Sequence, residues 1–426
     1  MKLIIKDKIF TDNTNELQKD EIFVLSQNNK AYEDIVRSRG FEIINSSSLK
    51  NYLNMSSIKI IGITGTNGKT TTATTIFKIL RKLGFSVALQ GTRGFFIDDK
   101  QIEEYSLTTP VQLGNFANIQ TAIENACQFF VMEVSSHAIS QNRIEGLDFA
   151  LKIHTNITRD HLDFHKTLQE YIDVKNSFLS DDCKKLVNID DKNLKFNKTD
   201  AYTYSLQNSA TYKVTSYDLQ NCMSVEFVFE NQTYTFSSKM VGIFNIYNLL
   251  ASICAVHITT NISLEKICEV LKDFTSVSGR VEVVSLEPFV VVDFAHTPDG
   301  MEEVLKSFPN KEIICLFGAG GNRDRQKRPL MGEVAKKYSK YVVVTSDNPR
   351  FEEPNDIIND ILEGISDKND VFVEVDRKKA LSLAISLAKK NSVVLVLGKG
   401  DEATQIIKDE KIPFLDKDEI LKILKK

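Results

Sequence analysis

A glycine-punctuated turn between an apolar strand and a helix is the feature that most constrains this chain. Residues Gly62–Thr72 have the sequence GITGTNGKTTT. The segment begins at the end of an apolar run rich in β-branched residues, Lys59–Ile63, which predicts a buried strand. It ends in the first turn of a predicted helix over Lys69–Leu83. In this context the backbone N–H groups of the turn can close around phosphate oxygens, and the N-terminus of the helix adds its dipole.

The turn predicts ATP or GTP binding. Lys69 supplies a charge for the outer phosphates, and the Thr70 hydroxyl can hold Mg²⁺. The strict pattern G-x-x-x-x-G-K-[ST] fails because Ile63 occupies its first glycine position, so a chance glycine-rich turn is the alternative. The phosphate-binding residues that we expect are Gly65, Thr66, Asn67, Gly68, Lys69, Thr70 and Thr71.

Length and composition bound the class of protein. A chain of 426 residues predicts about three domains. The 53 basic and 57 acidic residues nearly balance, which excludes a nucleic-acid-coating protein but allows local basic pockets. The six cysteines are scattered without metal spacing, and we find no signal-peptide core and no apolar run near the ~20 residues that span a bilayer. We therefore expect a soluble cytoplasmic protein without nucleic-acid or membrane partners.

Hydrophobic periodicity divides the chain into units 1–55, 56–278 and 279–426. The first unit has strands at 21–25 and 41–44 around a helix at 31–39, followed by a polar stretch, 45–57, that we interpret as a linker.

The second unit adds a strand that ends at Val134 and alternating, antiparallel strands within 211–236, with Asn231-Gln232 as a turn. Helices are expected at 245–258 and 264–274.

The third unit alternates apolar strands with helices, which predicts a mainly parallel sheet. The strands are expected at 289–294, 312–317, 341–346, 371–375 and 392–398, and the helices at 300–307, 329–337, 356–364 and 377–390. The fold class is α/β throughout.

Carboxylate and imidazole side chains follow two of the central strands. Glu133 ends one strand, where open α/β sheets bind ligands, and His161 follows the apolar segment 150–157. Together such groups can complete the shell of a divalent ion that bridges phosphate and a second substrate. A capping or core role for His161 and a hydrolase metal site are the alternatives.

Several segments in one order resemble the Mur ligase family, the ATP-dependent ligases of peptidoglycan precursor assembly. The similarity runs from about residue 60 to 402, in the segments 64–72, 132–137, 155–165, 171–179, 244–250, 278–284, 291–299, 317–332 and 346–354. The resemblance implies a small N-terminal domain that binds the uridine diphosphate of the substrate, a central P-loop ATPase domain and a C-terminal Rossmann-like domain. It also implies amide formation through an acyl phosphate.

By resemblance, Lys69, Glu133, His161 and Lys175 are catalytic. Mg²⁺ would be held by Thr70, Glu133 and His161, with Lys175 carried as a carbamate that helps to position the metal. On the sequence alone, Lys175 would be a solvated lysine on an amphipathic helix. For ATP, the resemblance implies Asn245, Arg280 and Asp293; this chain has Phe244 where the family commonly has histidine and Phe294 where it commonly has tyrosine.

The resemblance also implies the contacts to the other substrates. The nucleotide-sugar peptide would meet Thr108, Thr109, Ser135, Gln141 and Arg143, with Asp12 and Asn13 near the uridine. Without the family, Arg143 would be interpreted as a surface ion-pairing residue. The incoming amino acid would meet Arg323, Asp347, Asn348, Pro349, Arg350, Gly398 and Glu402.

The segment Asp347–Arg350 has the Asp-Asn-Pro-Arg sequence of the diaminopimelate-specific members. A guanidinium can clamp the second carboxylate of meso-diaminopimelate, whereas it would repel the ammonium of lysine. Two departures lie nearby, Asp401 for the usual histidine and Asn322 for the usual aspartate.

We therefore expect a monomeric enzyme that adds meso-2,6-diaminopimelate to UDP-N-acetylmuramoyl-L-alanyl-D-glutamate. The alternatives are a lysine-adding Mur ligase, a folylpolyglutamate synthetase-like ligase, and an ATP-gated regulatory protein without catalysis.

Overall fold

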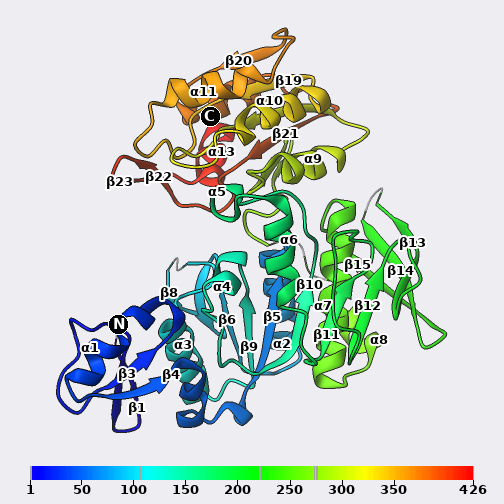
Figure 1. Cartoon of the computed structure of the whole chain (residues 1–426). Coiled ribbons are helices and arrows are strands. Elements are labelled where there is room, and N and C mark those ends of the chain that lie inside the picture. Colours follow the sequence, from blue (N-terminus) through cyan, green and yellow to red (C-terminus); the bar gives the residue numbers. More distant parts are fainter. Residues whose placement is uncertain (1, 105–106, 220–221, 273, 275–276, 426) are drawn as a thin grey trace.

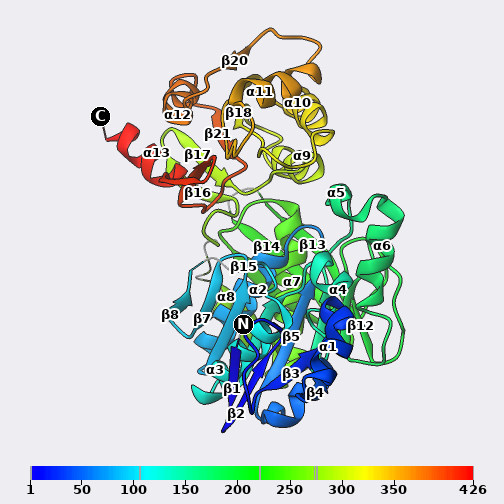
Figure 2. The same cartoon turned by 60° about the vertical axis from the view of Figure 1, so that its left-hand side comes forward.

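The computed structural model describes residues 2–104, 107–219, 222–272, 274 and 277–425. Its main sheets define three bodies in chain order (Figure 1). The central body lies between the other two, and the C-terminal body sits over one end of it in both views (Figures 1 and 2). The expected α/β class and three-domain arrangement are confirmed.

The N-terminal body is a four-stranded sheet in the order β1-β2-β3-β4. β1 and β2 form an antiparallel hairpin that the sequence analysis did not identify, although its alternating Leu3, Ile5 and Phe10 are buried. The strands and helices are β1 (Lys2–Ile5), β2 (Lys8–Thr11), β3 (Ile22–Leu25), η1 (Gln27–Tyr32), α1 (Glu33–Ser38), β4 (Glu42–Asn45), η2 (Ser46–Tyr52) and η3 (Met55–Ser57).

The helix expected near 31–39 is confirmed as α1, which a 3₁₀ helix precedes, but one expectation for this body was wrong. The polar stretch 45–57 is not a linker, because it forms η2 and η3 and buries Ser46 and Leu49. Leu49 packs into a core that the first and central bodies share, so this segment joins them rigidly.

The central body is built on eleven strands in the order β15-β14-β13-β12-β11-β10-β5-β9-β6-β7-β8. The pairs from β13 to β6 are parallel, and antiparallel strands extend the sheet at both ends, as expected for 211–236. The strands are β5 (Lys59–Thr64), β6 (Val87–Gly91), β7 (Gly94–Ile97), β8 (Lys100–Glu103), β9 (Phe129–Glu133), β10 (Phe149–His154), β11 (Lys185–Asn188), β12 (Ala201–Ser205), β13 (Tyr212–Asp218), β14 (Met223–Phe229) and β15 (Gln232–Ser238).

The turn between β14 and β15 is one residue earlier than expected. Gln232 pairs with Phe229, so the turn residues are Glu230 and Asn231, with φ of 49° and 62°. Asparagine tolerates this left-handed region better than most residues, which is why a turn centred on Asn231 was recognisable at all.

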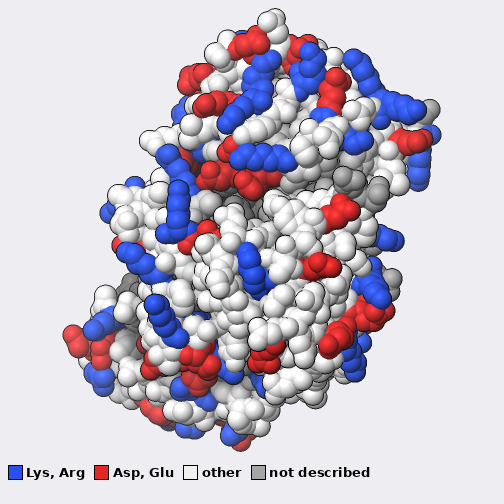
Figure 3. Space-filling view, turned by 90° about the vertical axis from the view of Figure 1, so that its right-hand side faces the viewer, with Lys and Arg blue, Asp and Glu red and all other residues white. Residues whose placement is uncertain are grey.

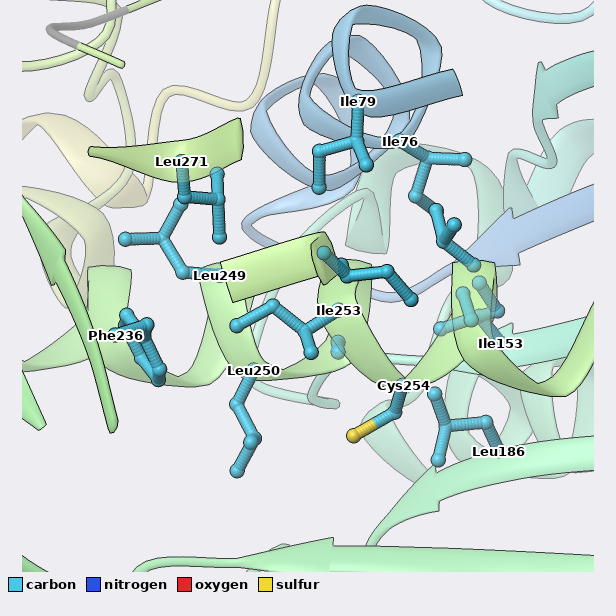
Figure 4. Close-up of a cluster of buried hydrophobic side chains, with 14 of the residues drawn as sticks. Ile76, Ile79, Ile153, Leu186, Phe236, Leu249, Leu250, Ile253, Cys254 and Leu271 are labelled. Atoms are coloured by element: carbon cyan, nitrogen blue, oxygen red, sulfur yellow. The ribbon is translucent and has the colours of Figure 1, made fainter. Parts of the chain in front are cut away.

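Alternate side chains of the central strands fill two cores. One core receives α2, α7 and α8, with Ile76, Ile79, Ile253 and Leu271 drawn in Figure 4. The other receives α3 together with the N-terminal sheet. The helices are α2 (Lys69–Lys82), α3 (Gln112–Glu124), α4 (Ser136–Ser140), α5 (Leu162–His165), α6 (Leu168–Ser177), α7 (Ile243–Thr260) and α8 (Leu264–Leu271).

The helices α7 and α8 were expected at 245–258 and 264–274. By length and composition alone α7 is apolar enough to cross a membrane, but 67% of it is buried inside the protein, where it packs in the core with α2 and α8. α8 ends at Leu271, and the expected extension to Phe274 includes residue 273, which lies outside the described residues.

The C-terminal body is a three-layer α/β unit whose sheet has the order β16-β17-β21-β18-β19-β20. All its pairs are parallel except β16-β17, which confirms the mainly parallel sheet. α9, α10 and α11 cover one face, and α12 and α13 cover the other. The elements are β16 (Glu282–Leu286), β17 (Phe289–Asp293), α9 (Pro298–Lys306), β18 (Glu312–Phe317), α10 (Lys327–Tyr338), β19 (Tyr341–Val344), α11 (Pro354–Glu363), β20 (Val371–Val373), α12 (Arg377–Ser386), β21 (Ser392–Leu397), β22 (Thr404–Ile407), β23 (Glu410–Pro413) and α13 (Asp416–Leu424).

α12 ends at Ser386, four residues before the sequence prediction. The polar residues after it make the turn into β21, where Ser392 N donates to Lys389 O. Such polar residues fit an exposed helix equally well, so the sequence could not mark this boundary. On the face drawn in Figure 3, basic and acidic side chains are interspersed over the molecule, in keeping with the near-balance of charge.

Candidate active site

A cavity of about 1060 Å³ separates the central and C-terminal bodies. Its walls include residues of α7, α9 and α10 and the loops that follow the parallel strands. The carboxyl ends of such strands are where open α/β sheets bind ligands. From the central body come the turn after β5, Glu133 at the end of β9 and the loop after β10. The C-terminal body contributes the loops that follow β17, β18, β19 and β21. The two halves of the predicted site therefore face one another.

The phosphate loop depends on two glycines. Gly65 and Gly68 have φ of 152° and 84°, and a Cβ on them would lie 1.8 Å from Thr155 Oγ1 and 2.3 Å from Asn248 Oδ1. Asn156 holds the loop from outside, since its carbonyl accepts from Thr66 N at 2.7 Å and its Oδ1 accepts from Asn67 N at 3.0 Å. Only glycine lets the backbone approach these neighbours.

Lys69 lies inside the loop. Its Nζ donates to Gly65 O at 2.8 Å and to Thr66 O at 2.9 Å. Burial lowers the pKa of Lys69 from its usual value, while the charges of Glu133 and Asp160 oppose that shift. An anionic phosphate entering this loop would meet the Lys69 amine and the N-terminus of α2.

Glu133 and Thr70 are in direct contact at the base of the cavity. The Thr70 hydroxyl donates to Glu133 Oε2 at 3.0 Å, and Thr92 N donates to Oε1 at 3.0 Å. Arg280 Nη2, from the segment that enters the C-terminal body, donates to Thr70 Oγ1 at 3.4 Å. Glu133 is 2% exposed, so its charge is held by these donors rather than by bulk water.

This hydroxyl–carboxylate pair fits Mg²⁺. The ion takes oxygen ligands and usually keeps several waters while it binds substrate phosphates, so it needs few protein ligands. Among the described residues, no group of three or more His, Cys, Asp or Glu side chains could hold a metal. A hydroxyl and a carboxylate side by side can serve an ion that is also bound to phosphate.

His161 stands at the start of α5 with φ of 52°. Its ring lies 4.9 Å from the ring of His137, and its Nε2 lies 3.3 Å from Asp160 Oδ2. Burial lowers the pKa of His161 to about 4, against the opposing charge of Asp160. The imidazole is neutral at pH 7, which is the form that ligates a metal. His161 and Glu133 line the same cavity.

Lys175 is buried, contrary to the surface position that its amphipathic helix indicated. Its side chain is 1% exposed, its Nζ donates to Gly65 O at 2.8 Å, and it lies 5.0 Å from the centre of the Tyr171 ring. Burial, and then the charge of Lys69, hold the pKa of Lys175 well below its usual value. Lys69 and Lys175 thus converge on one carbonyl oxygen.

The residues expected at ATP lie around the entry to the C-terminal body. Asn245, Arg280 and Asp293 all line the cavity. The Asp293 carboxylate accepts from Val281 N at 2.8 Å and Ala295 N at 2.6 Å, and burial raises its pKa. The Arg280 guanidinium lies 4.1 Å from the centre of the Phe294 ring, so this phenylalanine supports the arginine through a cation–π contact.

The residues expected at the nucleotide-sugar peptide form one connected group. Thr109 Oγ1 donates to Glu133 O at 2.9 Å and accepts from Ser135 N at 3.0 Å. Arg143 donates to Gln141 Oε1 at 2.6 Å and to Thr109 O at 2.8 Å, so it is not a surface ion-pairing residue in this structure.

This group reaches from the cavity toward the N-terminal body. Thr108 lines the cavity, while Asn28 of the N-terminal body donates to Gln141 O at 3.3 Å. Asp12 and Asn13 follow β2, and Asp12 O accepts from Asn29 Nδ2 at 3.3 Å.

The residues expected at the amino acid meet on the opposite wall. Arg323, Asp347, Asn348, Arg350, Gly398 and Glu402 line the cavity. Pro349 fixes the loop from behind, since a Cβ on Gly321 would lie 1.9 Å from its carbonyl oxygen. Arg350 Nη1 donates to Gly321 O at 2.8 Å, and burial lowers the pKa of its guanidinium, which remains charged.

Lys399 is a site residue that the sequence analysis missed. It is fully buried, and its Nζ donates to Asn348 Oδ1 at 3.3 Å, Glu402 Oε2 at 3.2 Å and Thr404 O at 2.7 Å. Asn348 Nδ2 also donates to Glu402 Oε2 at 2.8 Å. The lysine therefore holds the two polar groups of the amino-acid wall, and only its place between Gly398 and Glu402 could have signalled this.

Other missed residues line the cavity where the two bodies meet: Asp160 from the central body, and His296 and Lys327 from the C-terminal body. Burial pushes the pKa of Asp160 upward, but His161, His296 and Lys327 together lower it below the usual value. Each lies inside a segment that carried the family resemblance, and that was the available signal.

Comparison with known proteins places these features in one family. The Mur ligase middle domain matches residues 63–256, and the Mur ligase glutamate ligase domain matches residues 279–400. A UDP-N-acetylmuramoyl-L-alanyl-D-glutamate–2,6-diaminopimelate ligase of Helicobacter pylori is 47% identical over 419 residues, which cover 96% of this chain and 94% of the relative. The ligase of the same name from Wolinella succinogenes is 47% identical over 98% of this chain and 96% of its own length.

Solved structures agree. A ligase of that name is 27% identical, with a TM-score of 0.68 over 98% of this chain and 94% of its own. A folylpolyglutamate synthase from Mycobacterium tuberculosis, complexed with ADP and AMPPCP, shares the fold alone, at 14% identity and a TM-score of 0.67 over 83% of this chain and 91% of its own. The chain belongs to the Mur ligase family of enzymes.

Proposed function

We propose that this chain is an ATP- and Mg²⁺-dependent ligase that adds meso-2,6-diaminopimelate to UDP-N-acetylmuramoyl-L-alanyl-D-glutamate in the cytoplasm. One observation carries the proposal: a single cavity joins a phosphate loop and the Thr70–Glu133 pair to a loop that presents Arg350. The relatives at 47% identity bear the name of this activity.

The reaction requires two anions to be held together. The substrate carboxylate attacks the γ-phosphoryl group of ATP and displaces ADP, the amine attacks the acyl phosphate, and the tetrahedral intermediate releases phosphate and a proton. Lys69 and Arg280 supply positive charge on the two sides of Thr70, so they offset the repulsion between carboxylate and phosphate. Mg²⁺, held by Thr70, Glu133 and His161, would neutralise phosphate charge when bound.

We propose that Lys175 carries a carbamate. Carbamate formation joins a neutral amine to CO₂ and releases a proton, so it needs an uncharged lysine. Burial beside Lys69 lowers the pKa of the Lys175 amine and so favours that state. The product is an anion, which converts the repulsion between the two lysines into attraction. The modified side chain would join the groups that position Mg²⁺.

The connected group around Arg143 would hold the nucleotide-sugar peptide. A guanidinium forks well onto a carboxylate or phosphate, and Arg143 is already oriented by Gln141. Asp12 and Asn13 would lie near the uridine, on the first of three domains that we place at 1–55, 56–278 and 279–426. A single chain supplies every group in this assignment, so we propose that the monomer is active.

Arg350 would select diaminopimelate over lysine. It is held at the cavity wall by Gly321, where its remaining donors can clamp the distal carboxylate of diaminopimelate. The ammonium of lysine would meet a like charge there. This residue separates the proposal from a lysine-adding ligase and from a folylpolyglutamate synthetase-like ligase.

The test is ADP release by the purified chain with ATP, Mg²⁺ and UDP-N-acetylmuramoyl-L-alanyl-D-glutamate. Meso-diaminopimelate, L-lysine, L-glutamate or no amino acid is supplied in parallel. Release stimulated by diaminopimelate alone is the expected result. Preference for lysine would overturn the role of Arg350, and no stimulation in any reaction would overturn the substrate assignment.

A further inference from the structure

One ion pair connects the two walls of the cavity at its edge. Arg93 Nε, in the turn between β6 and β7 of the central body, donates to Asp401 Oδ2 at 2.9 Å. The partners are 308 residues apart in the chain, and their side chains are 28% and 18% exposed. Asp401 stands where the family usually has histidine, so this chain has a carboxylate at that position.

The Arg93 side leads directly to the reaction centre. Its neighbour Thr92 donates from its N–H and its hydroxyl to the two oxygens of Glu133, at 3.0 and 3.2 Å. Arg93 itself is held by its own body, because Gln101 Nε2 donates to Arg93 O at 3.2 Å and the guanidinium lies 6.0 Å from the centre of the Phe96 ring. The turn therefore has a fixed position relative to Glu133.

The Asp401 side leads to the amino-acid wall. Asp401 lies between Lys399 and Glu402, whose contacts with Asn348 form that wall. Glu402 N also donates to Lys399 O at 2.9 Å, which makes a tight turn around Asp401. A shift of Asp401 would therefore move Glu402.

The same loop rests on the connection between the two bodies. A Cβ on Gly279, which has φ of 66°, would lie 2.2 Å from Asp401 N. Gly279 N donates to Glu282 Oε2 at 2.8 Å, and Lys417 of α13 donates to Glu282 Oε1 at 2.6 Å. The connection, the loop of Asp401 and the turn of Arg93 line one small cavity of about 240 Å³.

We propose that Arg93 and Asp401 are positioning residues whose ion pair latches the C-terminal body onto the central body and seats the 398–402 loop over the acceptor side of the site. The expected change in KM rests on the proposed function. The expected effect of the ion pair on how the two bodies are arranged does not depend on that function. Breaking it frees the connection at Gly279 to swing and displaces Glu402 from the site where diaminopimelate would bind.

The test uses Arg93→Gln, Asp401→Asn and the charge-swapped pair Arg93→Asp with Asp401→Arg. Arg81→Gln is the matched control, because Arg81 is also 28% exposed and pairs with Asp98 at 3.1 Å inside the central body. Either single variant should raise KM for meso-diaminopimelate about fivefold, with a smaller rise in KM for ATP, and the swapped pair should recover most of that loss. Thermal unfolding of each variant shows whether it is folded.

Small-angle X-ray scattering without substrates gives a second measurement. Each single variant should have a larger radius of gyration than the wild type and the Arg81→Gln control. Unchanged kinetics and scattering in the single variants, or impairment that the swapped pair does not relieve, would overturn the latch. A wild-type protein without diaminopimelate-stimulated ADP release would instead overturn the proposed function, and the scattering comparison would still decide the latch.

Discussion

Two lysine amines meet at one carbonyl oxygen beneath the phosphate loop. Gly65 O accepts from Lys69 and from Lys175, each at 2.8 Å. Burial lowers the pKa of both amines, and the charge of Lys69 lowers the pKa of Lys175 further, as expected for like charges removed from water. The difference between them is access: Lys69 lines the cavity and can meet a phosphate, whereas Lys175 sits beside the loop.

Replacement of Lys175 by alanine should therefore reduce turnover about a hundredfold or more, with ATP binding largely retained, because it removes a group that positions charge at the reaction centre. ADP release and binding of a fluorescent ATP analogue measure the two effects. Lys192→Ala, at an exposed lysine of the same body, is the control. Full activity of Lys175→Ala would contradict a role for the carbamate.

Arg350 should decide which amino acid is used. Arg350→Ala should lower kcat/KM for meso-diaminopimelate about 10- to 100-fold, the usual range for loss of a hydrogen bond to a charged group. It should lower the discrimination against lysine by a similar factor, because the like charge is also removed. ADP release with each amino acid measures both, with Lys340→Ala as a surface control on the same body. Unchanged discrimination would remove Arg350 from the specificity site.

His296 should make the fold sensitive to acid. Burial, and then the charge of Lys327, lower its pKa from 6.5 to about 4. The unfolded chain therefore binds more protons between pH 6.5 and 4, and stability falls as the pH drops through that window. The contribution is on the order of 2 kcal/mol, allowing for partial access of solvent to the ring. His296→Asn should show a smaller loss of urea resistance between pH 7 and 5; an equal loss would exclude His296 as a source.

At the scale of elements, a buried ion pair joins α13 to α12, next to the strand ends that carry the loops expected to bind the amino acid. Arg377 donates to both oxygens of Asp416 at 2.8 and 2.7 Å, and both side chains are fully buried. The same guanidinium donates to Ser346 O and Leu397 O, at the ends of β19 and β21. The pair thus fixes the strand ends from which two of the site loops start.

Asp416→Asn should destabilise the C-terminal body by about 3 kcal/mol, since removal of one partner leaves a buried charge uncompensated. Chemical denaturation followed by a probe in that body measures the effect. Asp418→Asn, at an exposed position of the same helix, should be nearly neutral. Equal changes in the free energy of unfolding for the two substitutions would show that the buried ion pair does not stabilise the C-terminal body.

At the scale of the whole molecule, the bodies differ in how they are joined. Leu3, Phe10 and Val24 of the N-terminal sheet share one core with Phe116 and Phe130 of the central body. The C-terminal sheet has its own cores on both faces and meets the central body mainly across the cavity.

The first two bodies should therefore unfold as one cooperative unit and the C-terminal body as another. In hydrogen exchange at increasing urea, amides of β1 to β4 should lose protection together with those of β9, and amides of β18 and β21 should lose it separately. Deletion of residues 1–55 should expose the shared core and leave the central body poorly soluble. Separate loss of protection in the N-terminal sheet would contradict a shared core.

Local pattern determined much of the fold. Runs of β-branched residues marked the parallel strands, period-two alternation marked the antiparallel extension at 211–236, and the glycines of the phosphate turn marked the strand-to-helix transition. These signals act within a few residues, so no other part of the chain was needed to interpret them. The polar stretch 45–57 misled us for the same reason, because Leu49 is buried by residues far along the chain.

Packing between distant segments decided the rest. No pattern near Lys175 shows that it faces Gly65 O, none near Lys399 shows that it holds Asn348, and none near Arg93 shows that it pairs with Asp401. In each case the chemistry of the side chain depends on groups from distant segments of the chain. These groups exclude water from the side chain and place charged or polar atoms beside it. The sequence by itself determined many of the strands, the phosphate loop and the family. Only the tertiary structure decided which amines lose water and which loops face each other, because those depend on contacts between segments that the chain brings together only on folding.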